Sequence, residues 1–135
     1  MKKFYGESWF AKLILLKNYL AITLGPVAFS KSTFIQKHKN HECTHMRQWA
    51  EVAILSYIVL TVIMICTNIS PWFLLLPLIV YYVLYILEWL IRLQFNGIDA
   101  YRHLSFEREA YNNERDDCYN TNCGYFGWLA YVFKK

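Results

Sequence analysis

The chain has 135 residues, of which 56% are hydrophobic, 19% aromatic and only 18% charged. This length suits one domain, and we interpret residues 1–135 as a single membrane-embedded unit. Such an apolar composition is typical of membrane proteins and argues against an ordinary soluble domain. The net charge of +4 is mild, and no basic cluster is interleaved with aromatic residues as in a nucleic-acid surface, so nucleic acid is not an expected partner.

The four cysteines are scattered and do not indicate a disulfide framework. Cys43 lies within a histidine motif described below, and Cys66 lies within an apolar run. Cys118 and Cys123 are spaced C-x4-C and could pair or contribute to a second metal site. Two thiolates alone do not complete a tetrahedral metal site.

Residues 1–20 are expected to form a short helix rather than a cleaved signal peptide. Glu7, Lys12 and Lys17 interrupt the apolar stretch that a signal peptide needs. The helix would lie on a membrane surface or pack on the domain. Its apolar residues fall near helical spacing, at Trp9, Phe10, Leu13, Leu16 and Leu20.

A β-hairpin is expected next. Two short β-prone runs, 19–24 and 27–30, flank the break Gly25-Pro26. A purely structural hairpin is the simpler interpretation, but an exposed edge strand could also bind an extended peptide as an additional strand. Ser32 or Thr33 is a candidate cap for the helix that follows.

That helix carries the motif His41-Glu42-Cys43-Thr44-His45. Residues four apart lie on one helical face, so both imidazoles can bind one cation while Glu42 lies beside them. This is the HExxH signature of zinc sites. Because a catalytic zinc site has three protein ligands and a water, a third ligand is needed elsewhere. In the alternative interpretation, these are polar residues on a solvated helix.

A transmembrane helical hairpin is expected over residues 50–92. Residues 52–66 are uncharged and almost entirely apolar, 67–71 break the helix, and a second apolar run covers 72–87. Counted with the bounding tryptophans, each arm has about 20 residues, the length needed to cross a hydrocarbon core of about 30 Å. Pro77 is expected to kink the second arm. A hairpin buried in protein or in an oligomer is the alternative.

Tryptophans and charges suggest how the hairpin is oriented. Trp49 and Trp89 would lie at one membrane interface and Trp72 at the other. All 14 lysines and arginines lie outside the two apolar runs. The positive-inside rule therefore predicts that both termini and the histidine motif face the cytoplasm. The resemblance given below implies that the membrane is a bacterial inner membrane. Glu51 and Glu88 are expected to mark that interface.

The third ligand is expected on a helix that begins near Ser105. On this helix Glu107, Ala110 and Glu114 share one face. Because the hairpin returns the chain to the same side, Glu107 can approach the histidines, and the small Ala110 permits close helix packing. Glu109 and Glu114 are rival ligands, although Glu109 points about 200° away from Glu107 on an ideal helix.

Together these motifs resemble the gluzincin class of zinc metallopeptidases, in which HExxH on one helix is followed by Glu-x-x-Ala on another. This class includes the membrane-embedded CAAX-prenyl and heat-shock peptidases. A fuller pattern is also similar to small bacterial membrane-associated proteins classed as peptidases. It comprises Ile22-Thr23-Leu24-Gly25, His41-Glu42-x-Thr44-His45-x-x-Gln48 and Phe106-Glu107-x-Glu109-Ala110-Tyr111. The resemblance covers roughly residues 20–50 and 100–115.

The resemblance implies a mainly α membrane protein (α+β) with a minimal zincin-like core. A short β-hairpin would precede the HExxH helix, and the transmembrane hairpin would separate that helix from the third-ligand helix. Zn²⁺ would be held by His41, His45 and Glu107. Glu42 would be the catalytic base for a water that attacks a peptide bond.

The oxyanion formed in that reaction needs a donor besides the metal. His103 and Tyr111 are the leading candidates, ahead of Tyr101 and Arg102, and each could instead only support a ligand. Tyr111 stands where the CAAX-type enzymes usually have an acidic residue. The chain also has far fewer helices than those enzymes, so an enclosed chamber is not expected.

The tail is less clearly patterned. Residues 116–124 are typical of a turn, and the aromatic residues 125–135 fit either a final strand or an interfacial helix.

Three functions follow from the whole pattern. The first is an integral-membrane zinc endopeptidase acting on a peptide or protein substrate. The second is a membrane scaffold with a structural zinc site closed by four ligands. The third, an intramembrane protease, is disfavoured because Lys37, Lys39 and Arg47 flank the motif.

Overall fold

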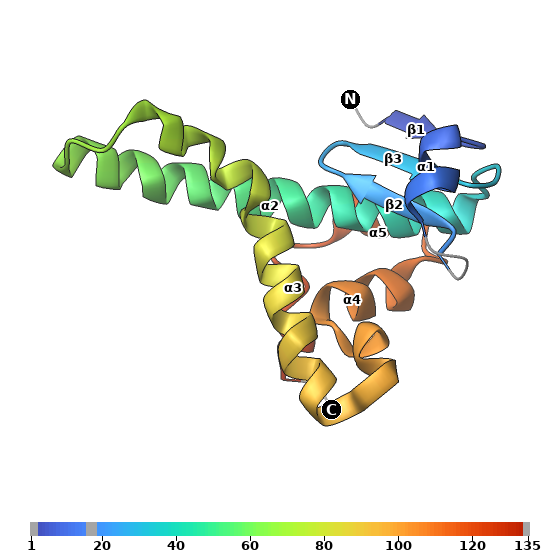
Figure 1. The fold of residues 1–135 in the computed structure, drawn as a ribbon. Helices are drawn as coiled ribbons and strands as arrows, with labels where there is room; N and C mark the ends of the chain where they lie inside the picture. The colour runs from blue at the N-terminus through green and yellow to red at the C-terminus, as the bar shows by residue number, and fades with distance from the viewer. Residues whose placement is uncertain (1–2, 16–18, 134–135) are drawn as a thin grey trace.

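The computed structural model describes residues 3–15 and 19–133. It is mostly helical with one small sheet, as predicted, and its longest helix extends far beyond the rest of the fold (Figure 1). The elements are β1 (Lys3–Tyr5), α1 (Trp9–Ile14), β2 (Ala21–Leu24), β3 (Val27–Ser30), α2 (Gln36–Cys66), the 3-10 helix η1 (Pro71–Leu75), α3 (Pro77–Asn96), the 3-10 helix η2 (Gly97–His103), α4 (Ser105–Asn113), α5 (Tyr119–Asn122) and α6 (Leu129–Val132).

The sheet contains the predicted hairpin and one strand that the sequence analysis missed. Its strand order is β1-β3-β2, with β2 antiparallel to β3 and β1 parallel to β3. Gly25 in the hairpin turn has φ +60, and a Cβ there would lie 3.3 Å from the ring of Trp49 on α2. Glycine is therefore required both for the turn and for the close approach of the hairpin to α2.

The predicted N-terminal helix is shorter than expected, because its beginning is replaced by β1 and a turn. Helix α1 has six residues and packs on the sheet, with the rings of Phe10 and Phe29 5.1 Å apart. Trp9 and Leu13 are exposed. Leu16 and Lys17, on which the prediction also drew, lie outside the described residues.

Helix α2 begins at Gln36, later than predicted, so Ser32 and Thr33 are not its caps. Ile35 occupies the N-cap position and makes no side-chain capping bond. The Thr33 hydroxyl instead lies 3.4 Å from a carboxylate oxygen of Glu7. The first half of α2 is polar and buried, whereas the half from 54 to 66 is apolar and largely exposed.

Two helices are long and apolar enough to cross a membrane, and this confirms the coarse prediction. They are α2 and a second that begins with α3 at Pro77. The predicted single arm from Trp72 is divided into η1 and α3. Pro77 starts α3 instead of kinking it, because proline at the first helical position needs no hydrogen-bond acceptor.

Helix α3 does not pair with the apolar half of α2. It crosses α2 near the middle and leaves it steeply (Figure 1). At the crossing, Trp49 Nε1 donates a 3.0 Å hydrogen bond to the carbonyl of Leu78. Further along, the Glu88 carboxylate accepts 2.9 and 2.7 Å hydrogen bonds from the backbone N–H and the hydroxyl of Ser105. Glu88 therefore caps the start of α4, and its expected place at a membrane interface stays a prediction.

The buried core lies where these helices meet. Val52 on α2, Tyr81 on α3 and Phe106 on α4 form its centre, and Trp128 from the tail packs against it with its ring 4.5 Å from that of Phe106. The core thus holds three separate parts of the chain together beside the histidine motif.

The tail folds into short helices along α2 and α4, and the alternative of a final strand is wrong. The tail also contacts α2 through its backbone, where the N–H of Phe126 donates a 3.0 Å hydrogen bond to the Glu51 carboxylate. Glu51 is buried and paired with Arg47, so it is a structural charge of the fold whether or not it lies near a membrane interface. Cys118 and Cys123 are free thiols.

Candidate metal site

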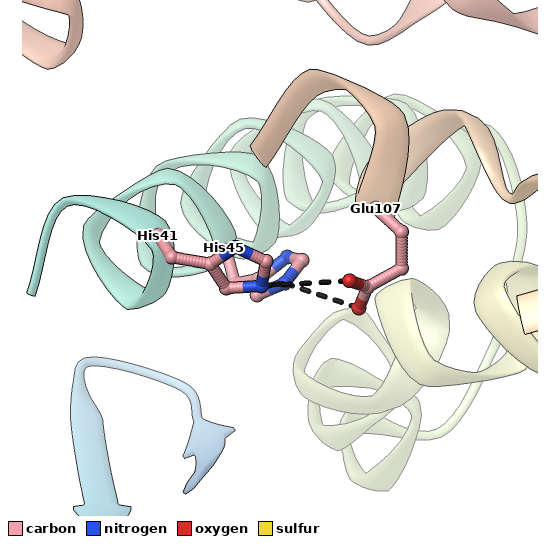
Figure 2. A group of neighbouring side chains, drawn as sticks. All are labelled: His41, His45 and Glu107. Atoms are coloured by element: carbon pink, nitrogen blue, oxygen red, sulfur yellow. Dashed lines mark hydrogen bonds and ion pairs between the residues drawn. The ribbon is translucent and has the colours of Figure 1, made fainter. Parts of the chain in front are cut away.

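The structure brings the three predicted metal ligands together. His41 and His45 project from one face of α2, and Glu107 projects from the first turn of α4, which begins at the predicted Ser105 (Figure 2). The two imidazole Nε2 atoms are 3.1 Å apart. Glu107 Oε1 lies 3.2 Å from His45 Nε2, and Glu107 Oε2 lies 3.4 Å from His41 Nε2. All three side chains are buried.

These distances suit one bound cation. With metal–ligand bonds of about 2.0–2.1 Å, ligand atoms around a tetrahedral centre lie about 3.3 Å apart, close to the spacing described here. Glu107 Oε2 is buried without a hydrogen-bond partner, although it faces the histidines. Two imidazoles and a carboxylate bind zinc and several other divalent metals. The group could therefore hold a metal ion, and its ligand types do not distinguish which one.

Two tyrosine hydroxyls orient Glu107. Tyr85 on α3 and Tyr101 on η2 donate hydrogen bonds of 2.6 and 2.8 Å to Oε1. Burial tends to raise the pKa of Glu107, but the charge of His45 and the hydrogen bonds of both histidines outweigh it and hold that pKa far below its usual range. The carboxylate is thus an ionised ligand of fixed orientation.

Gln48 sets the tautomer of His45. Its Oε1 lies 2.9 Å from His45 Nδ1, while its Nε2 donates to the carbonyl of Phe106 at 3.0 Å and to Glu109 at 2.7 Å. Because an amide oxygen only accepts, His45 Nδ1 must carry a hydrogen, so Nε2 is the nitrogen that a metal would bind, in place of the proton that Nε2 carries when His45 is charged. The Tyr81 hydroxyl lies 3.2 Å from the same amide oxygen.

The two rival ligands lie elsewhere. Glu114 is behind His41, 3.5 Å from its Nδ1, and forms a 3.0 Å ion pair with Lys37. Glu109 is fully buried on another face of α4 and pairs with Arg47. Neither carboxylate belongs to the group of converging ligand atoms among the described residues.

Glu109 is enclosed by the tail as well as by α2. The Tyr119 hydroxyl donates a 2.7 Å hydrogen bond to it, and burial, followed by this contact with Glu109, raises the pKa of Tyr119. A Cβ at Gly127 would lie only 2.3 Å from Glu109 Oε1. Glycine at this position therefore lets the tail close over the carboxylate.

Glu42, the predicted base, is held by the sheet. The Thr23 hydroxyl of β2 donates a hydrogen bond to Glu42 Oε2, and both side chains are buried. This contact fixes the edge strand β2 relative to the histidine helix. Thr23 was part of the sequence pattern, but its partner could not be read from the sequence.

Two adjoining cavities reach the site. An outer cavity of about 610 Å³ has charged walls, and an inner one of about 270 Å³ is lined mainly by β2 and by the tyrosines of α3. Glu42 and His41 line both, so the candidate base and a candidate ligand are accessible from either space. Both cavities are lined by Tyr19, Ala21, His41, Glu42 and Tyr101.

The predicted oxyanion donors are not equivalent. Tyr111 lines the outer cavity with its ring 4.6 Å from that of His41, and burial, together with the Glu107 charge, raises the pKa of Tyr111 to about 12. Its hydroxyl is therefore a neutral donor at physiological pH. Tyr101 and Arg102 also line this cavity. His103 is half-buried in η2 and lines neither cavity, so the expectation that it leads is not supported.

Helix α3 contributes tyrosine hydroxyls to the candidate metal site, and this was not predicted. Tyr81 and Tyr85 touch the metal-ligand shell from a helix that was interpreted only as a membrane span. Their spacing of four residues places both hydroxyls on one face, and this periodicity was the available signal. Tyr82 accepts a 2.6 Å hydrogen bond from the N–H of Gly25 and ties the hairpin to the same helix.

Comparisons with protein-family models, with curated proteins and with solved structures give no match for this chain. Its function is therefore argued from the geometry of its own residues. The observations that carry the argument are the ligand triad, the adjacent carboxylate and the cavities that reach them.

Proposed function

We propose that the chain is a membrane-bound, zinc-dependent endopeptidase with its active site at the cytoplasmic membrane surface. One observation carries the proposal. The three ligands His41, His45 and Glu107 converge beside Glu42, at cavities bordered by an edge strand. A zinc ion bound there would supply a water of pKa near 7 and polarise a carbonyl.

The side chains around that position have the chemistry for the remaining steps. Glu42 is placed to accept a proton from the attacking water and to pass it to the leaving amine. Thr23 holds that carboxylate in place through its hydroxyl. The neutral hydroxyl of Tyr111 is our first choice of donor to the oxyanion, because it faces the outer cavity next to His41.

The edge strand supports a peptide as substrate. Strand β2 lies at the edge of the described sheet, and residues 21–24 line the inner cavity beside Glu42. An extended peptide could pair with such an edge through its backbone, which would present a carbonyl to the site without requiring a particular side chain. The β-hairpin beside the histidine helix and the carboxylate on α4 are compatible with the minimal zincin-like core that the resemblance implies, which stays part of the proposal.

The membrane assignment is supported by the exposed apolar helices and by the charge distribution. Helix α2 from 54 to 66 has large apolar side chains open to solvent, which lipid would cover. All lysines and arginines lie outside the two apolar runs, which favours a cytoplasmic site. The alternative, a scaffold with a structural zinc, needs a fourth protein ligand, and the triad in the described residues offers three.

The test compares metal content and cleavage in the same detergent-purified samples. The unaltered chain, Glu107→Ala and Glu42→Gln are each assayed for bound metal and for hydrolysis of a casein-type reporter. Glu7→Gln is the matched control, because Glu7 is an exposed glutamate remote from the triad.

We expect one zinc in the unaltered chain, its loss in Glu107→Ala, and retained zinc with lost cleavage in Glu42→Gln. The control should keep both properties. Full cleavage by Glu42→Gln would eliminate the proposed base. Zinc that persists in Glu107→Ala would show that the third ligand is misassigned, and zinc without any cleavage in the unaltered chain would favour the scaffold.

A further inference from the structure

Helix α3 has two faces of opposite character. Its inner face carries Tyr81 and Tyr85 toward the metal site, together with Glu88 and Arg92, which bind α4 and the tail. Both charges of this helix therefore lie on the protein side. The outer face is exposed and uncharged, and its stripe at helical spacing is Ile79, Val83, Ile86, Leu90 and Leu93.

The apolar half of α2 is exposed in a different direction. Residues 54–66 extend away from the domain with η1 returning beside them, whereas α3 leaves the crossing steeply (Figure 1). At 1.5 Å per residue, this arm of α2 is about 20 Å long, and α3 is about 30 Å long. Because α3 leaves α2 steeply, the two cannot both be perpendicular to one bilayer, and if either is perpendicular the other is inclined toward the membrane plane.

The exposed surfaces distinguish these two orientations. The arm is exposed and apolar at Ile54, Ile58, Val62 and Ile65, with no charge between 52 and 66, so it suits full immersion. Helix α3 exposes apolar residues on its outer face and on its flanks, such as Leu84 and Ile91, whereas its inner face covers the metal site. A helix with one apolar face and one face bound to a water-soluble domain is suited to lie in the plane of an interface.

We propose that α3 lies along the membrane surface with its outer face in one leaflet, while only the arm formed by the second half of α2 and by η1 (the inserted arm) penetrates the hydrocarbon core. This refines the membrane part of the proposed function and rests on it. The predicted pair of transmembrane helices is then replaced by one inserted arm and one interfacial helix.

The orientation places the metal site one helix away from lipid. The outer side of α3 contacts the acyl chains, and its inner side contributes Tyr85 to Glu107, so lipid and site are separated by about one helix diameter of 10 Å. Helix α1 lies at the opposite end of α2 from the inserted arm (Figure 1). Its exposed Leu13 is therefore on the water side.

The test is a depth profile by spin labels on single cysteines in lipid vesicles. The four native cysteines are replaced by alanine, and labels are placed on α3 at Ile79, Val83, Ile86 and Leu90. A second series on the inserted arm uses Ile54, Ile58 and Val62, and Leu13 serves as an exposed apolar control. All these side chains are at least partly open, so the labels displace no core contact.

In α3 we expect equal depths, within a few ångströms, from position 79 to position 90. A crossing helix would instead give a gradient of about 16 Å over those positions. Along the inserted arm the depth should increase by about 12 Å from position 54 to position 62, and Leu13 should be in water. Each variant is used only if its zinc content equals that of the unaltered chain.

The outcomes separate this inference from the proposed function. A gradient along α3 overturns the inference and restores a transmembrane α3, with the peptidase intact. Labels in water at all positions of both series overturn the membrane assignment itself. A second test measures membrane retention of the variant Val83→Lys, made in the chain that keeps its native cysteines. A lysine on an interfacial helix can reach the headgroups, so more than half of this variant should stay in washed membranes, whereas its loss from them contradicts an interfacial α3.

Discussion

The two halves of α2 differ in which side chains they bury, although they form one continuous helix. In the first half, polar and charged residues such as His45, Gln48 and Glu51 are buried, each with named partners. In the second half, the large apolar side chains from Ile54 to Ile65 are exposed. A soluble helix normally buries its apolar face, and the second half of this helix does not.

The difference is what two surroundings would produce, protein around the first half and, as we propose, lipid around the second. The first half is stabilised by charge pairs and hydrogen bonds among buried side chains, where an unpaired group is costly. The second half leaves its large apolar side chains exposed, and under the proposed membrane assignment lipid would cover them. Four predictions test this contrast, from the largest expected effect to the smallest.

Removing the charge at the centre of the buried half should have the largest effect. Arg47→Met leaves both Glu51 and Glu109 without their cation, and loss of one partner of a buried pair destabilises by about 3–5 kcal/mol. The thermal midpoint in detergent should fall accordingly. Arg115→Met, on the exposed surface, is the control and should leave the midpoint nearly unchanged. A normal midpoint for Arg47→Met would mean that the polar half is not held by this pair.

A charge in the exposed half should act through the membrane instead. Ile58→Lys places an ammonium within the inserted arm, where a lysine costs about 2.5–3.5 kcal/mol. The fraction retained in carbonate-washed membranes should drop. Ile35→Lys changes an equally exposed isoleucine at the start of α2 and should have no such effect. Equal retention of both variants would show that the second half does not contact lipid.

The hydrogen bond behind His45 should tune metal affinity. Gln48→Leu removes the acceptor at Nδ1, and such a change typically lowers affinity by 10- to 100-fold. A titration against a competing chelator measures this change. The control is Gln36→Leu, which changes an exposed glutamine at the first residue of the same helix. Unchanged metal affinity in Gln48→Leu would show that the hydrogen bond from Gln48 to His45 does not affect metal binding.

The smallest effect is expected from α3. Tyr85→Phe deletes one of two hydroxyls on Glu107, worth about 1 kcal/mol or about five-fold in metal affinity. Tyr82→Phe is the matched control, because the Tyr82 hydroxyl binds the hairpin and not the ligand. If both variants bind metal equally well, α3 only packs beside the site. The same chelator titration provides the answer.

Local patterns were enough to predict the ligand triad. The spacing of His41 and His45 on a helix and the start of α4 at Ser105 depend on nearby residues, and a turn of helix then places Glu107 on the required face. The hairpin was predictable for the same reason, because Gly25-Pro26 separates two short β-prone runs. The sequence could thus specify which side chains converge.

Tertiary contacts decided what the sequence could not predict. Three residues of β1 are too few to show a periodic pattern, and their pairing with β3 is parallel and distant in sequence. The apolar run after Pro77 has the composition of a membrane span. The four-residue spacing of Tyr81 and Tyr85 indicates only that they share a face, not that this face meets the metal ligands. The roles of Glu51 and Glu88 likewise depend on partners far along the chain.

The close packing of Gly127 against Glu109 limits which substitutions both positions can accept. A methyl group there would overlap the Glu109 carboxylate, which in turn binds Arg47 and Gln48. A larger residue at position 127 therefore becomes acceptable only if the acid at 109 is shortened, for example to aspartate. In descendants of this sequence the two positions should change jointly, so a family alignment would show them as a covarying pair.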